Sequence, residues 1–160
     1  GGLQRFLPAS LSLLAPNVNS YRRLIRYHAA PINVQWGLDN RTVGLRVPDS
    51  GRESRRVENR VPGADANPYL AIAASLACGL LGMQQKLDPS APVTASAYDM
   101  PYELPRSLEQ SLQALENSDD LKEMLGTRFV QAWHAVKESE YDTFLQVISS
   151  WEREHLLLNV

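Results

Sequence analysis

The chain has 160 residues, of which 44% are hydrophobic, and its net charge is −2. This size predicts one compact domain or a piece of a larger one. The longest apolar run, Leu70–Met83, is too short to cross a bilayer, and no charged-then-apolar signal segment opens the chain, so neither a membrane location nor export is predicted. The single cysteine, Cys78, excludes an internal disulfide and favours a cytoplasmic location.

The charge is distributed unevenly along the chain. Residues 1–60 contain ten arginines, no lysine and four acidic residues, whereas residues 61–160 contain six basic and fourteen acidic residues. Arginine without lysine favours anion binding in a fixed geometry over a diffuse basic surface. The arginines are spread over several predicted elements, with no aromatic platform and no DNA-binding motif, so nucleic acid is not expected as a partner.

A pair of strands is predicted after Pro31. Apolar and polar residues alternate from Ile32 to Trp36, which indicates a half-buried strand. Asp39 and Asn40 are typical turn residues, and Thr42–Val47 predicts a second strand. The segment from Pro31 to Val47 is therefore expected to form a hairpin.

A third strand is predicted over the sequence RRVENRV. Alternation places Arg56, Glu58 and Arg60 on one face. Val57 and Val61 then point into the core. A carboxylate between two arginines stays ionised and is a suitable ligand for a hard cation, while the arginines suit phosphate or carboxylate oxygens. The alternative is an exposed strand held by salt bridges alone.

The second half of the chain is predicted to be helical. Asn67 suits an N-cap before a helix from Pro68 toward Lys86, which is apolar nearly all round and should be deeply buried. Ser107 and Gln110 predict a capping box for a short helix. After Gly126, helical spacing of apolar residues continues to Trp151, which predicts one long terminal helix. Strands followed by helices indicate an α+β fold.

Three blocks together resemble a known family. They are APNVNSYRRL at 15–24, WGLDNRTVGLRVP at 36–48 and VENRVPGADANPYL at 57–70. In this order and spacing they are similar to the C-terminal catalytic region of the glutamine synthetase family, and their residues are most similar to those of the γ-glutamylpolyamine synthetase branch. The resemblance covers 1–160 and implies part of a catalytic domain, with a partial antiparallel sheet (an open barrel section) covered by helices. The N-terminal domain and the first part of the catalytic domain would lie upstream.

The resemblance also implies roles for six residues. The glutamate-binding positions are Arg23 and Arg60, the ATP-binding positions are Arg41, Arg46 and Arg56, with Arg41 also catalytic, and the ligand of Mg²⁺ or Mn²⁺ is Glu58.

The implied reaction is ATP-dependent ligation of glutamate to an amine through a γ-glutamyl phosphate. Ammonia-using members carry a glutamate in the loop after NSYRR, whereas Ala29 occupies that position here, which favours an organic amine or polyamine. The alternatives are a glutamine synthetase that uses ammonia and a non-catalytic relative. The resemblance further implies a ring-shaped homo-oligomer, with active sites between subunits, and predicts that the isolated 160-residue chain is inactive.

Overall fold

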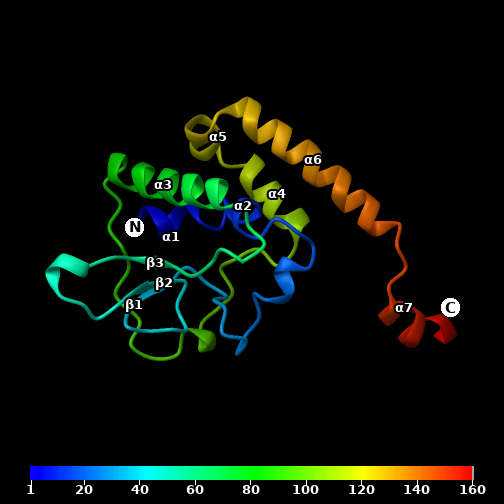
Figure 1. Ribbon diagram of the computed structural model, residues 1–160, viewed down its shortest axis with the longest axis horizontal. Helices are drawn as coiled ribbons and strands as arrows, with labels where there is room; N and C mark the ends of the chain where they lie inside the picture. The colour runs from blue at the N-terminus through cyan, green and yellow to red at the C-terminus, as the bar shows by residue number, and fades with distance from the viewer. Residues whose placement is uncertain (160) are drawn as a thin grey trace.

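The protein consists of a layer of helices above a small sheet and its long connecting loops (Figure 1). The computed structural model describes residues 1–159. The predicted α+β class is confirmed. The helices, in chain order, are α1 (Gly2–Phe6), α2 (Leu11–Leu14), α3 (Pro68–Gln84), α4 (Leu108–Glu116), α5 (Asp119–Leu125), α6 (Thr127–Leu145) and α7 (Ser150–His155).

The sheet has three short strands in the order β1-β2-β3: β1 (Trp36–Leu38), β2 (Leu45–Val47) and β3 (Glu58–Asn59). β2 and β3 are antiparallel, but β1 and β2 are parallel. The predicted hairpin over 31–47 is therefore wrong. Asn40 explains the difference, because its side-chain amide donates hydrogen bonds to the carbonyls of residues 93 and 95. These bonds hold the β1–β2 connection against a distant loop, where a hairpin would need a tight turn.

β3 is too short to impose the predicted alternation. Val61 is fully buried, as expected, but Val57 is 54% exposed, so the prediction that it packs inward is wrong. Regular pairing covers only Glu58 and Asn59. Val57 precedes the paired residues and lies beside the open face of α3, where it lines a groove of about 830 Å³.

α3 begins as the sequence predicts and is buried on one face only. The Asn67 side chain accepts a hydrogen bond from the Tyr69 N–H at 3.0 Å, and Pro68 is the first helical residue. The buried face includes Ala74 and Cys78. The prediction of burial all round is wrong, because the opposite face exposes large apolar side chains: Tyr69, Ile72, Leu76, Leu80 and Met83.

The core lies between the N-terminal helices and α3 and α4. α2 contributes Leu11, Leu13 and Leu14, each at most 1% exposed, to a cluster that also contains the leucines of α4. α6 closes this cluster from the side, where the Trp133 indole N–H donates to the Ser12 hydroxyl at 3.2 Å. The described residues contain no helix long and apolar enough to span a membrane.

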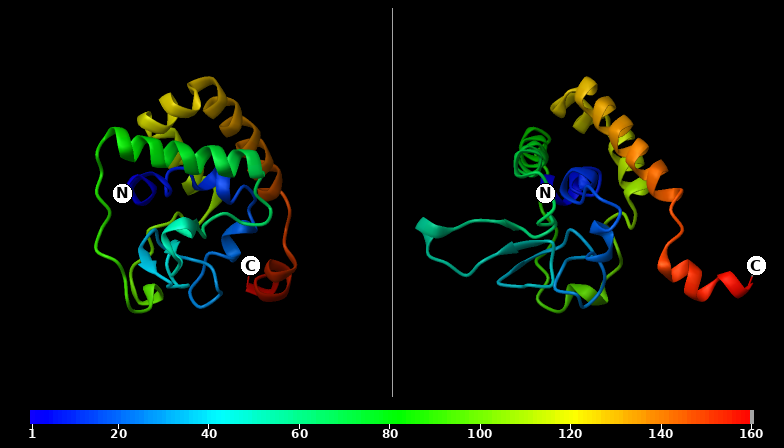
Figure 2. Two further views of the ribbon diagram at one scale, coloured as in Figure 1. Left: turned by 60° about the vertical axis from the view of Figure 1, so that its left-hand side comes forward. Right: turned by 45° about the vertical axis from the view of Figure 1, so that its right-hand side comes forward.

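Two capping motifs shape the C-terminal helices. At α4, Ser107 caps the Gln110 N–H at 3.2 Å, but the Gln110 side chain accepts from the N–H of residue 106, so only half of the predicted capping box forms. Ser149 and Glu152 form a complete capping box, at 3.2 and 2.7 Å, that starts α7. The predicted single helix to Trp151 is therefore wrong, since α6 ends at Leu145 and α7 stands away from the body (Figures 1 and 2).

Candidate active site

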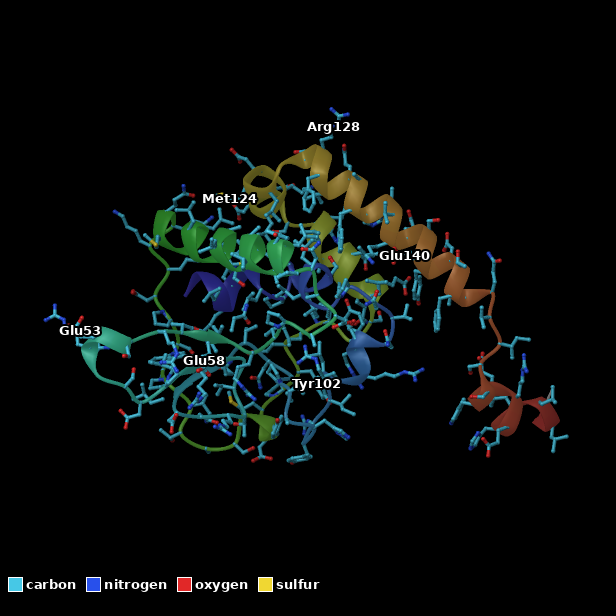
Figure 3. The ribbon with its side chains drawn as sticks, viewed as in Figure 1. Glu53, Glu58, Tyr102, Met124, Arg128 and Glu140 are labelled. Atoms are coloured by element: carbon cyan, nitrogen blue, oxygen red, sulfur yellow. The ribbon has the colours of Figure 1, made fainter. Side chains whose placement is uncertain are left out.

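An ion-pair cluster crosses the sheet from β2 to β3. The antiparallel register places Arg46 opposite Glu58, and Arg46 Nη1 donates to Glu58 Oε2 at 2.7 Å. Arg46 also donates to the carboxylate of Asp39, and Arg56 donates to Glu58 Oε1 at 3.3 Å. Glu58 lies among the strands in Figure 3. Two arginines therefore bind the carboxylate of Glu58, and one of them, Arg46, also binds Asp39.

The cluster keeps its carboxylates ionised at neutral pH. The hydrogen bond from Arg46 lowers the pKa of Glu58, and the charges of Arg46 and Arg56 lower it further. The hydrogen bond from Arg46 likewise lowers the pKa of Asp39. The side chain of Glu58 remains 33% exposed, so it combines a fixed negative charge with access from outside.

Arg60 belongs to a different part of the site from the one predicted. Its guanidinium donates to the backbone carbonyls of Ala29 at 3.0 Å, Val43 at 3.2 Å and Arg41. The arginines that flank Glu58 are thus Arg46 and Arg56, and the predicted flanking by Arg56 and Arg60 is wrong. Burial lowers the pKa of Arg60, and the nearby charges of Arg46 and Arg41 add to this effect.

Arg23 contacts the chain segment that follows Arg60. Its guanidinium donates to the Val61 carbonyl, and burial lowers its pKa, although the charge of Asp65 opposes this shift. Asp65 accepts hydrogen bonds from Ser20 and from Asn17. Burial alone would raise the pKa of Asp65, but these hydrogen bonds and the charge of Arg23 lower it overall.

Arg41, like Arg23 and Arg60, lies outside the ion-pair cluster formed by Arg46, Arg56, Glu58 and Asp39. Its side chain is exposed and, within residues 1–159, no hydrogen bond or ion pair holds its guanidinium. Only its backbone carbonyl takes part, as an acceptor for Arg60. Of the other predicted residues, Arg46, Arg56 and Glu58 form one group, while Arg23 and Arg60 bind backbone carbonyls beside it.

Glu58 fits one ligand of a divalent cation and no more. Its carboxylate is a hard oxygen donor, which suits Mg²⁺ or Mn²⁺. No group of three or more His, Cys, Asp or Glu side chains within the described part of the chain is arranged to hold a metal ion. A complete site would therefore need donors from elsewhere, such as substrate phosphates or other polypeptide segments.

Sequence reasoning missed two carboxylates and one carbonyl. Asp39 was assigned only to a turn, yet it pairs with Arg46, and Asp65 was assigned no role although it lies beside Arg23. Asp39 precedes the predicted strand that carries Arg46, and Asp65 follows the predicted strand that carries Arg60, so closeness in sequence to arginines is the signal that could have found them. The carbonyl of Ala29 carries no sequence signal, because any residue supplies one.

Comparison with known proteins places this geometry in context. The chain matches the family model of the glutamine synthetase catalytic domain over residues 1–156. It is 41% identical over 157 residues to type-1 glutamine synthetase 2 of Dictyostelium discoideum, which covers 94% of this chain and 30% of that protein. It is also 41% identical over 160 residues to the γ-glutamylputrescine synthetase of Escherichia coli strain K12, which covers 99% of this chain and 34% of that protein.

The fold is similar to that of a solved structure as well. The ligand-free form of GmaS superimposes with a TM-score of 0.84 at 34% identity, over 98% of this chain and 36% of that chain. The present chain thus spans about a third of the length of the curated proteins it matches, at 30% and 34% for the two above.

Proposed function

The chain belongs to the glutamine synthetase family, and from this premise we propose that it forms part of the active site of an ATP-dependent glutamate–amine ligase. The observation that carries the proposal is the convergence of Arg46 and Arg56 on the accessible carboxylate of Glu58, with Arg60 on a neighbouring segment. Fixed positive charge next to a metal-ligating carboxylate suits the transfer of a phosphoryl group to an anionic nucleophile.

In the proposed reaction the side-chain carboxylate of glutamate attacks the γ-phosphorus of ATP. This step gives γ-glutamyl phosphate and ADP. The amine nitrogen then forms a bond to the carbonyl carbon of the γ-glutamyl phosphate, the bond from that carbon to the phosphate oxygen breaks and releases inorganic phosphate, and the amine loses one proton. Both reactants in the first step are anions, so the barrier contains a large repulsion that arginines can offset.

The residues of the candidate site suit separate parts of this task. Arg60 uses three of its five N–H donors on backbone carbonyls, which fixes its plane and leaves two donors for the glutamate carboxylate. The guanidinium of Arg23 donates to the carbonyl of Val61, the residue that follows Arg60, and Arg23 is assigned to the same substrate. Arg46 and Arg56 are assigned to the phosphates of ATP, and the exposed Arg41 to the transferring phosphoryl group.

Glu58 is assigned as one ligand of the divalent cation. Mg²⁺ or Mn²⁺ held there would supply positive charge that offsets the negative charge of the transferring phosphoryl group. The arginine contacts keep Glu58 deprotonated and oriented at the sheet. Because the chain supplies a single such carboxylate, we propose that it has no turnover unless the rest of a catalytic domain is present.

We assign the acceptor as an organic amine, with polyamines favoured. The support is Ala29, which stands where ammonia-using members carry a glutamate, so the loop lacks the carboxylate that would attract ammonium. The second candidate is a glutamine synthetase that uses ammonia, because the chain is as similar to a protein of that name as to a γ-glutamylputrescine synthetase. A non-catalytic relative is the third. A ring-shaped homo-oligomer and a cytoplasmic location belong to the same proposal.

The test is phosphate release from ATP and glutamate, measured with the full-length protein that contains this chain. Ammonium, putrescine, ethanolamine and a monoamine are supplied in turn. Release with an organic amine and not with ammonium supports the proposal. Release with ammonium alone assigns a glutamine synthetase, and a folded protein that is silent with every amine is a non-catalytic relative.

A further inference from the structure

The loop formed by residues 25–30 has an unusual backbone next to Arg60. Tyr27 and Ala29 have φ values of 64° and 59°, in the left-handed region that residues other than glycine rarely adopt. Such conformations persist where surrounding contacts hold them. The Ala29 carbonyl accepts a hydrogen bond from Arg60 Nη2 at 3.0 Å, so this loop is fixed against the arginine assigned to glutamate.

A second segment faces this loop. It is the single 3₁₀ turn Ala97–Asp99, which two hydrogen bonds attach to the sheet region. The Ala97 N–H donates to Thr42 Oγ1 at 2.8 Å, and the buried Asn33 side chain donates to the Ala97 carbonyl at 2.8 Å. Thr42 lies between residues 41 and 43, whose carbonyls accept hydrogen bonds from Arg60. The 3₁₀ turn and the Arg60 side chain are therefore both bonded to the segment of residues 41–43.

Tyr27, Tyr98 and Asp99 join the loop to the turn. The two tyrosine rings lie 5.3 Å apart between centroids, and the Tyr27 hydroxyl donates to Asp99 Oδ1 at 3.2 Å. Tyr27 is 69% exposed. Within residues 1–159 the second carboxylate oxygen of Asp99 has no hydrogen-bond partner. The result is an exposed aromatic ring beside a carboxylate that is only half satisfied.

The neighbouring charged groups leave Asp99 available. Both oxygens of Glu103 already accept hydrogen bonds, at 2.8 and 2.6 Å. The guanidinium groups of Arg26 and Arg106 lie over the Tyr102 ring, 5.3 and 4.7 Å from its centre. Tyr102 is labelled on the strand side of the molecule in Figure 3. Arg26 also donates to the Met100 carbonyl at 3.2 Å, and within residues 1–159 neither arginine forms an ion pair with Asp99.

We propose that Asp99 and Tyr27 form a subsite for the distal ammonium group of a diamine or polyamine acceptor. The inference rests on the proposed function, in which the other amino group attacks the glutamyl phosphate. A primary ammonium donates up to three hydrogen bonds, so it can bind the free oxygen of Asp99 while it lies against the Tyr27 ring. A monoamine of equal length has no second charge and makes neither contact.

The subsite is tested in the full-length protein by steady-state kinetics with putrescine and n-butylamine. These amines have equal chain lengths and differ in the second amino group. Asp99→Asn should raise KM for putrescine by about tenfold, as expected for one lost hydrogen bond to a charged group, and should leave KM for n-butylamine within about twofold. Tyr27→Phe keeps the ring and should have a smaller effect of the same kind. Asp142→Asn, the same change on the exposed side of α6, should alter neither value.

The selectivity for putrescine separates recognition from a structural role. If Asp99→Asn changes KM for both amines equally, or for neither, the subsite is overturned. If the unmodified protein releases no phosphate with any amine, the proposed function fails first, and the subsite fails with it. Loss of selectivity in Asp99→Asn with turnover intact is the result that supports the inference.

Discussion

Two glycines of α3 provide a matched test of how closely the helices pack. At Gly82 an added Cβ would lie 2.3 Å from the Cα and 2.5 Å from the nitrogen of Gly2 in α1, whereas at Gly79 a Cβ would meet nothing within 4 Å. Ordinary contacts of a Cβ begin near 3.4 Å, so Gly82→Ala has to move α1 by about 1 Å. Gly79→Ala requires no movement.

The two substitutions share one contribution and differ in the other. Each should gain about 1 kcal/mol of helix propensity, because alanine restricts the unfolded chain more than glycine does. Only Gly82→Ala adds overpacking, which costs about 1–3 kcal/mol. Gly79→Ala should therefore raise the free energy of unfolding by about 0.5–1 kcal/mol, while Gly82→Ala should leave it unchanged or lower it by up to about 2 kcal/mol.

Urea unfolding followed by tryptophan fluorescence measures both changes on the same protein. For a chain of this size, 1 kcal/mol corresponds to roughly 2–4 °C in Tm, so thermal melts provide an independent reading. The same shift in both variants would show that the backbone contact between Gly2 and Gly82 does not limit packing, and would refute the reasoning.

Three further results are expected. Arg60→Lys should lower the rate of phosphate release by ~10²-fold, because lysine has no planar fork to span the three carbonyls and hold its charge in place; a rate within twofold of the original would contradict this role. The lowered pKa values of Glu58 and Asp65 mean that their contribution to stability is present above about pH 4 and is lost as the pH falls through the folded-state values, so Asp65→Asn should flatten the acid side of a Tm–pH curve. Burial raises the pKa of the Cys78 thiol to about 11, so its alkylation by iodoacetamide at pH 8 should proceed no faster than unfolding, and rapid labelling of the native protein would show that the site opens.

Local signals predicted those elements that local chemistry determines. Asn67 and Pro68 start α3 because the cap and the proline act within one turn. The direction of β1 relative to β2 depends on where the Asn40 amide finds its acceptors, more than fifty residues away, and spacing cannot show this. The end of α6 was missed because apolar periodicity continues through residues 146–149, while Ser149 starts a new helix there.

The candidate site divides in the same way. The residue types came from the family resemblance, but the partners of each side chain came from the fold. Glu58 meets Arg46 through the β2–β3 register, and a two-residue strand is too short to predict from alternation. Arg60 binds backbone carbonyls, which every residue has, so no pattern of side chains in the sequence predicts its partners.

The hydrogen bond between Trp133 and Ser12 has a consequence for how the chain acquires its fold. Its two residues are 121 positions apart, and α6 is the element that closes the leucine core of α2 and α4. At about 5–20 residues per second, a ribosome needs roughly 6–24 s to add the intervening chain. During that time the leucines of α2 lack this cover, so we expect the early part of the nascent chain to be prone to association with other chains until α6 has been synthesised.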